Sequence, residues 1–522
     1  MNSNASSIPL LLAAAVLIAG AASLFFAGRD GATSASSRRG ADQVILISLD
    51  TLRQDHLSLY GYPRPTTPNL ERLAADAAVF DHAMAQAPFT LPSHMSMLTG
   101  LYPSAHQVRM FQDVLADSFV TLAESLREAG LETAAITDGG YVNARFGFDQ
   151  GFDLYDDGRV LGTQERNGFR RFGRRVRRFL IDHRDEPFFL FVHSFDTHGP
   201  YFVEPEYREA LSGTEPVVPA GAASIDDPLQ YMRSLAVHEY YQLDRYDTLA
   251  EMIDDYDAAI RYVDERVGEI IGLLHALDRF DSSLIIVTSD HGEAFLDHGL
   301  YTGHGLTLYE EEVRVPLLVK FPHGRFKGVR SSDVVRLIDL FPTVTASTGV
   351  RCPKEVQGTD LARALSGRDP EPRTAFGENP NLSRTQEGEV ADPTCYVRRG
   401  EFKYLDAPSI DMRGHLSRLF VGTGGYDLDR DPLGLKERMR TGAELYNLAR
   451  DPVESRNLIR GRRAVIDAIR AVLFRRLAVD RLLFDSKNIA ESDGSLPLSD
   501  AEIEMLQQQG YLGVERGARR AR

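Results

Sequence analysis

The hydrophobic pattern divides the chain into buried strands and amphipathic helices. Runs of consecutive apolar residues, many of them β-branched, predict strands buried on both faces, and they lie at 44–49, 133–137, 188–192, 284–288 and 316–321. Apolar positions at helical spacing lie between them, at 118–129 and 256–277. Strands alternating with helices predict an α/β fold with a mainly parallel central sheet flanked by helices. Ligands of such sheets bind beyond the carboxyl ends of the strands.

The pattern changes after about residue 372. Short strand-like pieces at 395–398, 402–405 and 444–446 precede a helical pattern at 463–477, which together predict a smaller C-terminal α+β subdomain. We therefore place a main domain at 42–372, the subdomain at 373–480, and a C-terminal helix and tail at 481–522. Ser499 and Glu502 form a capping-box pattern at the start of that helix.

Two further stretches are compatible with the predicted α/β main domain. Phe169, Phe172, Val176 and Phe179 recur at helical spacing among arginines, which favours a solvated helix with its apolar face inward over a contact with anionic lipid. Residues 201–248 have no clear period and are interpreted as an irregular insertion over the site.

The N-terminal segment predicts export. Residues 8–28 carry no charge and are long enough to span a bilayer, which needs about 20 residues, yet they equally suit a secretory signal peptide. Residues 1–28 are thus a signal peptide or a membrane anchor, and the small residues of 29–41 form a linker. We expect an extracytoplasmic protein, periplasmic or secreted, in which this segment would supply any membrane association.

The overall charge limits the partners. A net charge of −16 argues against nucleic-acid binding, and an anionic substrate would need local help from a metal ion or a helix N-terminus. Cys352 and Cys395 are the only cysteines, so at most one disulfide can form and a cysteine-rich zinc site is excluded.

The stretch from Ala87 to Gly100 predicts a turn and a short helix. Pro92 suits the first turn of a helix and Gly100 its end. Thr90 then lies at the helix N-terminus, where anions bind favourably. Its hydroxyl can be a helix cap or a nucleophile, and this stretch alone favours the cap.

Acidic and histidine residues follow several predicted strands. Asp50 ends strand 44–49, and Asp290 and His291 follow strand 284–288, so the three should meet at one edge of the sheet. Two carboxylates and one imidazole suit Mn²⁺ or Zn²⁺ better than Ca²⁺, which they also admit. His198 lies beyond strand 188–192, and His304 lies in a glycine-flanked loop.

Six motifs in order resemble the sulfatases of the alkaline-phosphatase superfamily. They are SLDTLRQDHLSLYGYPRPTTPNLERLA, TLPSHMSMLTGLYPSAHQV, FDTHGPY, SDHGEAFLDHG, GHGLTLYEEEVRVPLLVKFP and LYNLARDPVESRNL, within about 42–477. The resemblance implies a sulfatase-like α/β core and a divalent metal ion held by Asp50, Asp290 and His291. It also implies that Thr90 is the nucleophile and contacts the metal.

The resemblance implies further roles around this centre. His198 and His304 match positions that contact the sulfate or phosphate group or protonate the leaving oxygen. His94 and Arg53 lie in the matching motifs as candidate substrate contacts. Thr51 stands where many sulfatases have a second aspartate ligand.

One departure from the family pattern concerns the nucleophile. Typical sulfatases have Cys or Ser at the position of Thr90 and Arg at that of His94, and the Cys or Ser is oxidised to formylglycine. A threonine, being a secondary alcohol, cannot give that aldehyde, so no formylglycine is expected. We expect a hydrolase in which the Thr90 alkoxide attacks the sulfur or phosphorus of a small-molecule, glycan or lipid ester.

Three alternatives remain open at this stage. The first is a two-metal phosphodiesterase whose second ion is held by Asp196, His198 and His304. The second is a transferase that passes a phospho-group to a lipid or glycan acceptor. The third, a non-catalytic glycan-binding protein, is disfavoured by the retained acidic and histidine residues. The sequence does not choose between sulfate and phosphate.

Overall fold

The computed structural model describes residues 40–110, 112–158, 168–233, 241–299, 301–369, 373–379, 394–406 and 442–487. The predicted segment at 8–28 and the predicted helix after Ser499 lie outside these ranges and stay predictions. Within the described ranges, no helix combines the length and the apolar character needed to cross a membrane. The description below concerns the unit that begins at Gly40.

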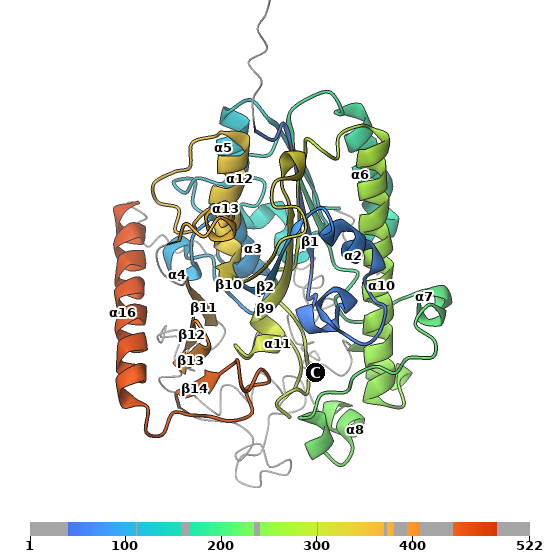
Figure 1. Cartoon of the computed structure of the whole chain (residues 1–522), viewed down its shortest axis with the longest axis vertical. Coiled ribbons are helices and arrows are strands. Elements are labelled where there is room, and N and C mark those ends of the chain that lie inside the picture. The colour runs from blue at the N-terminus through green and yellow to red at the C-terminus, as the bar shows by residue number, and fades with distance from the viewer. Residues whose placement is uncertain are drawn as a thin grey trace, which may run out of the picture. The chain divides into compact units, whose positions relative to one another are not determined.

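A mixed sheet of eight strands forms the centre of the protein (Figure 1). Across the sheet the strands are β10 (Arg330–Arg336), β2 (Ala78–Met84), β9 (Arg314–Lys320), β6 (Leu284–Thr288), β1 (Gln43–Leu49), β5 (Phe188–Ser194), β3 (Glu132–Ile136) and β4 (Leu154–Asp156). β9 runs antiparallel to both of its neighbours, and the other neighbouring pairs are parallel. The predicted mainly parallel sheet is confirmed, with all five predicted strands in it.

Three of the strands have no continuous apolar run, so the pattern did not predict them. β10 exposes most of its first half, and β4 has three residues, of which Leu154 is exposed. β2 carries two half-exposed polar residues, Asp81 and His82, in its middle.

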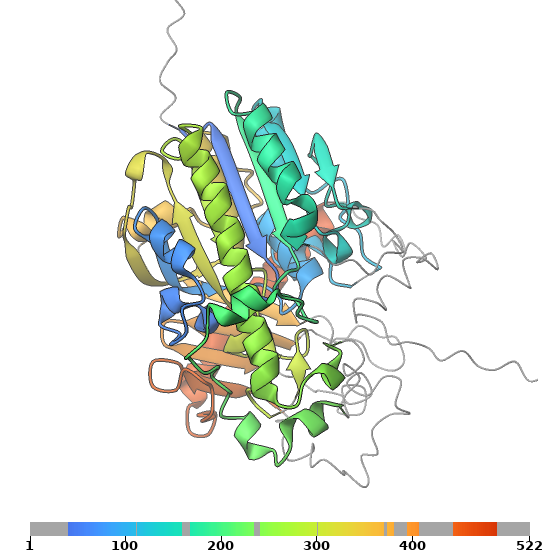
Figure 2. The same ribbon diagram turned by 90° about the vertical axis from the view of Figure 1, so that its right-hand side faces the viewer.

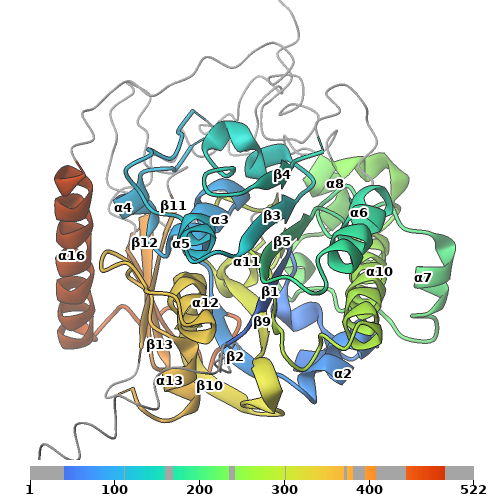
Figure 3. The same cartoon turned by 90° about the horizontal axis from the view of Figure 1, so that it is seen from above.

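Helices cover both faces of the sheet (Figure 3). One face carries α2 (Pro68–Ala74), α6 (Gly168–Asp182) and the long α10 (Leu249–Ala276), which runs beside α6 (Figure 2). The other carries α3 (Thr90–Thr99), α5 (Leu122–Glu128) and α12 (Leu340–Thr348). Side chains alternate along β1 between the two cores: Ile45 and Ile47 pack with the first group and Val44 and Leu46 with the second.

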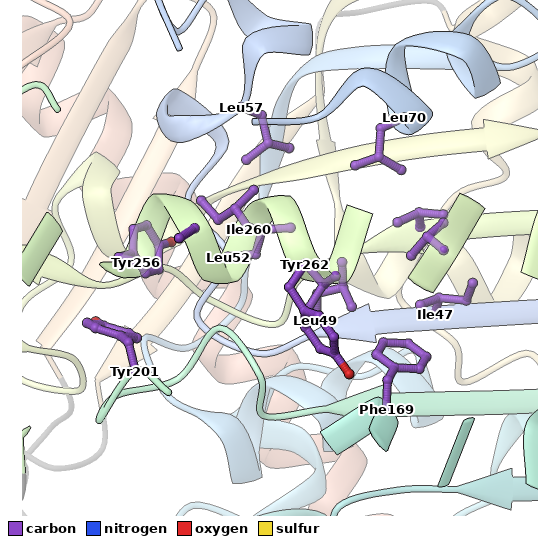
Figure 4. Packing of buried hydrophobic residues seen from close by; sticks show 14 of the residues in the cluster. Ile47, Leu49, Leu52, Leu57, Leu70, Phe169, Tyr201, Tyr256, Ile260 and Tyr262 are labelled. Carbon is purple, nitrogen blue, oxygen red and sulfur yellow. The ribbon is translucent and has the colours of Figure 1, made fainter. Parts of the chain in front are cut away.

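Helix α10 also fixes the turn that follows β1. Figure 4 shows Ile260 of α10 next to Leu52, and Tyr256 and Leu49 belong to the same buried cluster. The Tyr256 hydroxyl donates to the carbonyl of Thr51 at 2.8 Å and accepts from the N–H of Arg53 at 2.8 Å. Leaving these buried backbone groups unpaired would cost about 1–3 kcal/mol each. Asp50 is the first residue of this turn.

The other helical predictions are confirmed with changes at their ends. Phe169, Phe172, Val176 and Phe179 are buried on α6, as the inward-facing interpretation requires. α10 begins before the predicted position because Thr248 caps it, accepting from the N–H of Glu251 at 3.2 Å. The insertion is less irregular than expected, since it contains α7 (Pro205–Glu209) and α8 (Pro228–Arg233).

A second, antiparallel sheet forms the smaller C-terminal part. It consists of β11 (Thr374–Asn379), β12 (Thr394–Arg399), β13 (Phe402–Asp406) and β14 (Glu444–Asn447), in that order. Helix α16 (Arg463–Ser486) packs on it through Ile469 and Leu473 (Figure 1). The predicted strands and helix are confirmed, although α16 runs past residue 477. Cys352 and Cys395 are both free thiols.

Glu310, at the start of α11 (Glu310–Val313), joins the two sheets electrostatically. Its carboxylate accepts from Arg398 of β12 at 2.8 Å and from Lys403 of β13 at 3.0 Å, and all three side chains are buried. Burial opposes ionisation, but the charges of Arg398 and Lys403 outweigh it and lower the pKa of Glu310 to about 2.

We predict that Glu310→Gln destabilises the protein by about 3–5 kcal/mol, because it leaves the buried Arg398 without its carboxylate partner and removes one of the two carboxylates that pair with the buried Lys403. Since the folded pKa is below the ordinary value of 4.5, the stabilisation is complete above that pH and is lost as the pH falls toward 2. Urea unfolding at neutral pH and at pH values below about 4 measures both effects. Glu265→Gln, at a half-exposed pair with Arg266, is the matched control and should cost under about 1 kcal/mol. Equal losses in the two variants would contradict the prediction.

Candidate active site

The candidate site lies where β1, β5 and β6 end. Parallel register places Leu49 of β1 beside Ser194 of β5, and Ser48 beside Thr288 of β6. Asp50 follows β1, and Asp290 and His291 follow β6 by two and three residues. The strand-end rule therefore brings these three side chains together, as the sequence predicts.

Thr90 is the first residue of α3 and faces this group. Its Oγ1 donates to Oδ2 of Asp50 at 3.3 Å and lies 3.3 Å from Nε2 of His291. The N-cap position belongs to Phe89, and no side chain caps the helix. The helix ends at Gly100 with φ 68°, as Gly at this position predicts. The Thr90 hydroxyl thus points at the acidic cluster. It does not act as the helix cap that residues 87–100 alone would favour.

The cluster fits a divalent cation. The candidate ligand atoms of Asp50, Asp290 and His291 all lie within 4.8 Å of one another, and all three residues are buried. Oδ1 of Asp50 and Oδ2 of Asp290 are buried and receive no hydrogen bond, which is costly unless a cation balances them. Nδ1 of His291 bonds the carbonyl of Gly292 at 2.8 Å, which turns Nε2 toward the cluster as metal-binding histidines require.

Burial also governs the charge of this cluster. Desolvation raises the pKa of Asp50 to about 7, although His291 and hydrogen bonds oppose the shift. Such a carboxylate is poorly stabilised as an anion by its own protein surroundings. A bound cation would reverse this shift, so the electrostatics of the cluster also suit a metal ion.

His94 lies beneath the cluster, not on an accessible wall. Its Nε2 lies 2.9 Å from Oγ of Ser48, and its Nδ1 lies 3.0 Å from the carbonyl of Thr90. Burial lowers its pKa to about 3, so the ring is neutral. This placement suits support of the Thr90 backbone, and it does not favour the substrate contact that the sequence suggested.

Arg53 likewise faces the protein. Its five N–H groups donate to the carboxylates of Asp55 and Asp297 and to the carbonyl of Glu293, at distances of 2.7–3.0 Å. Every donor is therefore engaged by a protein acceptor. The arrangement favours a structural role in the loop after β6 over the anion contact expected from the sequence.

His198 and His304 come together beside His291. The ring centroids of His304 and His291 are 4.5 Å apart, and those of His198 and His304 are 4.9 Å apart. Nδ1 of His198 bonds the carbonyl of Gly199 at 2.7 Å, and Nδ1 of His304 lies 3.0 Å from Oε1 of Glu293. Burial lowers the pKa of His304 to about 4, with Asp290 opposing the shift. The two predicted histidines thus lie next to the candidate metal group.

The structure does not bring Asp196 to these histidines. Its Oδ2 accepts from the N–H of Phe169 at 2.9 Å and from the hydroxyl of Ser194 at 2.5 Å, at the start of α6. Asp196, His198 and His304 do not form one of the metal-compatible groups found in the described part of the chain. The geometry therefore gives no support to the predicted second metal ion.

Sequence reasoning gave no role to His193 or Glu293, and it gave Thr51 only as the replacement of an aspartate ligand. Nε2 of His193, in β5, lies 3.2 Å from Oδ2 of Asp50, a contact that its place near the end of a strand could have suggested. Glu293 lies in the motif SDHGEAFLDHG, which assigns it no role. Thr51 has φ 56°, which is rare for a β-branched residue, and its hydroxyl donates to the carbonyl of Thr197 at 2.7 Å.

The chain is similar to known proteins in sequence and in fold. Residues 42–350 match the family model described as Sulfatase. The chain is 22% identical to N-acetylgalactosamine-6-O-sulfatase of Bacteroides thetaiotaomicron, over 82% of this chain and 92% of the relative. It is 26% identical to human arylsulfatase A, over 80% and 83% of the two chains. The solved phosphonate monoester hydrolase of Agrobacterium radiobacter has a similar fold, with a TM-score of 0.63 and 20% identity over 85% of this chain and 96% of that one.

Proposed function

The chain belongs to the sulfatase family and is a hydrolase of sulfate or phosphate esters, and from this premise we propose that it uses a threonine nucleophile and a divalent metal ion. One observation carries the proposal. The Thr90 hydroxyl lies 3.3 Å from both Asp50 and His291, inside a buried group that fits a cation. The formylglycine route of the family is closed to a threonine, so the hydroxyl itself has to react.

Asp50, Asp290 and His291 would hold the metal ion, with Thr90 beside it. When bound, a divalent cation at such a position lowers the pKa of a neighbouring hydroxyl and withdraws charge from an ester oxygen. The protein adds orientation: Tyr256 fixes the turn after β1, and Ser93 of α3 donates to the carbonyl of Asp290 at 2.7 Å. The nucleophile and the ligands are therefore tied to the same strand ends.

In this proposal Thr90 is the nucleophile, and one of the two histidines transfers the proton to the leaving group. In the first step Oγ1 of Thr90 forms a bond to sulfur or phosphorus while the bond from that atom to the leaving oxygen breaks in line. His198 or His304 takes the hydroxyl proton of Thr90 and gives it to the leaving oxygen. Water then hydrolyses the Thr90 ester, releasing sulfate or phosphate and restoring the hydroxyl. The N-terminus of α3 stabilises negative charge on the transferred group.

The relative N-acetylgalactosamine-6-O-sulfatase supports a proposal for the substrate class. We propose a small glycan ester or a related monoester, met outside the cytoplasm if the N-terminal segment directs export as predicted. A transferase or a non-catalytic binding protein finds no specific support in the site. A two-metal phosphodiesterase is not favoured either, given the position of Asp196.

A panel of esters tests this proposal. Aryl and glycan sulfates, phosphate monoesters and diesters, and phosphonate esters are assayed with Mn²⁺, Zn²⁺ and Ca²⁺ on the metal-stripped protein. We expect turnover of at least one class that depends on added metal, and a covalent adduct on the peptide containing Thr90 after rapid acid quenching. Absence of turnover with every ester and metal, or an adduct on another residue, would contradict the proposal.

A further inference from the structure

We propose that Glu293 is a positioning residue that holds His304 in the ring orientation and tautomer suited to protonating the leaving oxygen. We further propose that Tyr241 holds Glu293 in turn. The inference rests on the proposed function, since it gives His304 the role of general acid. It extends that function by assigning roles to two residues that the motifs left unexplained.

The carboxylate of Glu293 is fully buried and is the centre of a small hydrogen-bonded group. Oε1 lies 3.0 Å from Nδ1 of His304 and accepts from the Tyr241 hydroxyl at 2.9 Å. Oε2 accepts from the Tyr201 hydroxyl at 3.4 Å. The ionised carboxylate can only accept, and the bonds from the Tyr241 and Tyr201 hydroxyls favour that form, so we assign Nδ1 of His304 as the donor in this pair.

This bond decides which nitrogen of His304 takes part in the reaction. With the proton on Nδ1 directed to Glu293, exchange of a proton with the leaving oxygen falls to Nε2. The ring is in contact with His291 and His198, so it borders the metal group and the second candidate acid. Nε2 of the neutral ring takes the hydroxyl proton of Thr90 as Oγ1 attacks and gives it to the leaving oxygen, while the Nδ1 proton stays on the ring. In the second step Nε2 takes a proton from the attacking water and returns it to Oγ1 of Thr90.

The surroundings of Glu293 leave it little freedom. Its carbonyl accepts from Arg53 at 2.9 Å, and the preceding Gly292 is so close to the chain at Glu311 that a Cβ there would lie 2.0 Å from the Glu311 carbonyl oxygen. Tyr241 is confined too, because a Cβ on Gly199 would lie 2.2 Å from its ring. Tyr241 therefore packs against Gly199 and donates a hydrogen bond to Glu293. It thus links the loop of His198 to the loop of His304.

Leaving-group dependence separates a positioning role from a structural one. Two esters of the same acid are compared, one with a nitrophenol leaving group that needs no protonation and one with an alkyl alcohol that does. We expect Glu293→Gln to lower kcat for the alkyl ester by about 10²–10⁴-fold and for the nitrophenyl ester by less than about tenfold. His304→Ala should show the same pattern, and the double variant should be no worse than His304→Ala.

Glu312→Gln is the matched control. Glu312 is equally buried and accepts from the N–H of Gly305 at 2.7 Å, in the loop of His304, and it also accepts from Tyr301 and Thr307. Its substitution should affect both esters alike. If Glu293→Gln also affects both alike while His304→Ala discriminates, the role of Glu293 is refuted and the proposed function stands. If no variant and no ester reveals turnover, the proposed function fails.

A spectroscopic measurement tests the positioning without turnover. In ¹⁵N-labelled protein we expect the neutral His304 ring to carry its proton on Nδ1, and Glu293→Gln to change that tautomer balance. Should Glu293→Gln fail to fold, Tyr241→Phe gives the same two measurements, with the same direction and a smaller size. An unchanged His304 signal in a folded variant would overturn the proposal.

Discussion

Replacement of Thr90 by alanine is expected to lower kcat by about 10³–10⁶-fold for every ester the enzyme accepts, the range found when a covalent nucleophile is removed. The variant loses the Oγ1 atom that would form the intermediate, while the metal ligands and both histidines remain. The loss should appear in kcat, since the groups that bind the ester are unchanged. Steady-state kinetics with saturating metal measures it.

The fold should tolerate this change. The Thr90 hydroxyl makes two contacts at 3.3 Å and does not cap α3, so its removal takes no partner from the helix backbone. Thr90→Ser keeps a hydroxyl and should retain turnover within about 100-fold of the natural enzyme, whereas Thr90→Val, which keeps the shape, should match the alanine variant. If Thr90→Ala keeps turnover within tenfold, Thr90 is not the nucleophile.

The sheet could be predicted where burial on both faces left a continuous apolar run. Strands β1, β3, β5, β6 and β9 carry such runs and were found, with small errors at their ends. β10 and β11 could not be found this way, because β10 is largely exposed and pairs with β2, far earlier in the chain, and β11 (Thr374–Asn379) mixes small and polar residues. Pairing, and not local pattern, makes these segments strands.

In the site, too, some features could be predicted from the local sequence and others depend on distant partners. Asp50, Asp290 and His291 could be placed together because the strand-end rule needs only the order of strands and helices. The surroundings of His94 and Arg53 depend on partners far along the chain, Ser48 and Asp297, which no periodicity reveals. A motif fixes which residue types are present, but only packing decides which of them face the substrate and which face the protein.

Metal removal is the second change with a large expected effect. The stripped protein should lose activity by at least about 10²-fold and regain it on addition of one divalent ion per chain. It should also unfold at a lower temperature, because binding at 100 times Kd contributes about 2.7 kcal/mol to the folded state. Elemental analysis and thermal unfolding with and without a chelator measure both quantities.

The variant Asp290→Asn tests whether Asp290 is one of the ligands of the metal ion. The variant should bind no tight ion and show no thermal shift with metal. It should nevertheless be more stable than the stripped natural protein, because an amide replaces a buried carboxylate that has an oxygen without a hydrogen bond. A stripped variant less stable than the stripped natural protein would show that Asp290 is stabilised by something other than a cation.

Asp196→Asn then decides the number of ions. Its carboxylate bonds Phe169 and Ser194 at the start of α6, so its substitution should change neither the stoichiometry of one ion per chain nor the metal dependence of turnover. Two tightly bound ions in the natural protein, one of which disappears in Asp196→Asn, would establish a two-metal site. That result would require Asp196 to leave the helix N-terminus and turn toward His198, which makes the single-ion outcome the one expected from this geometry.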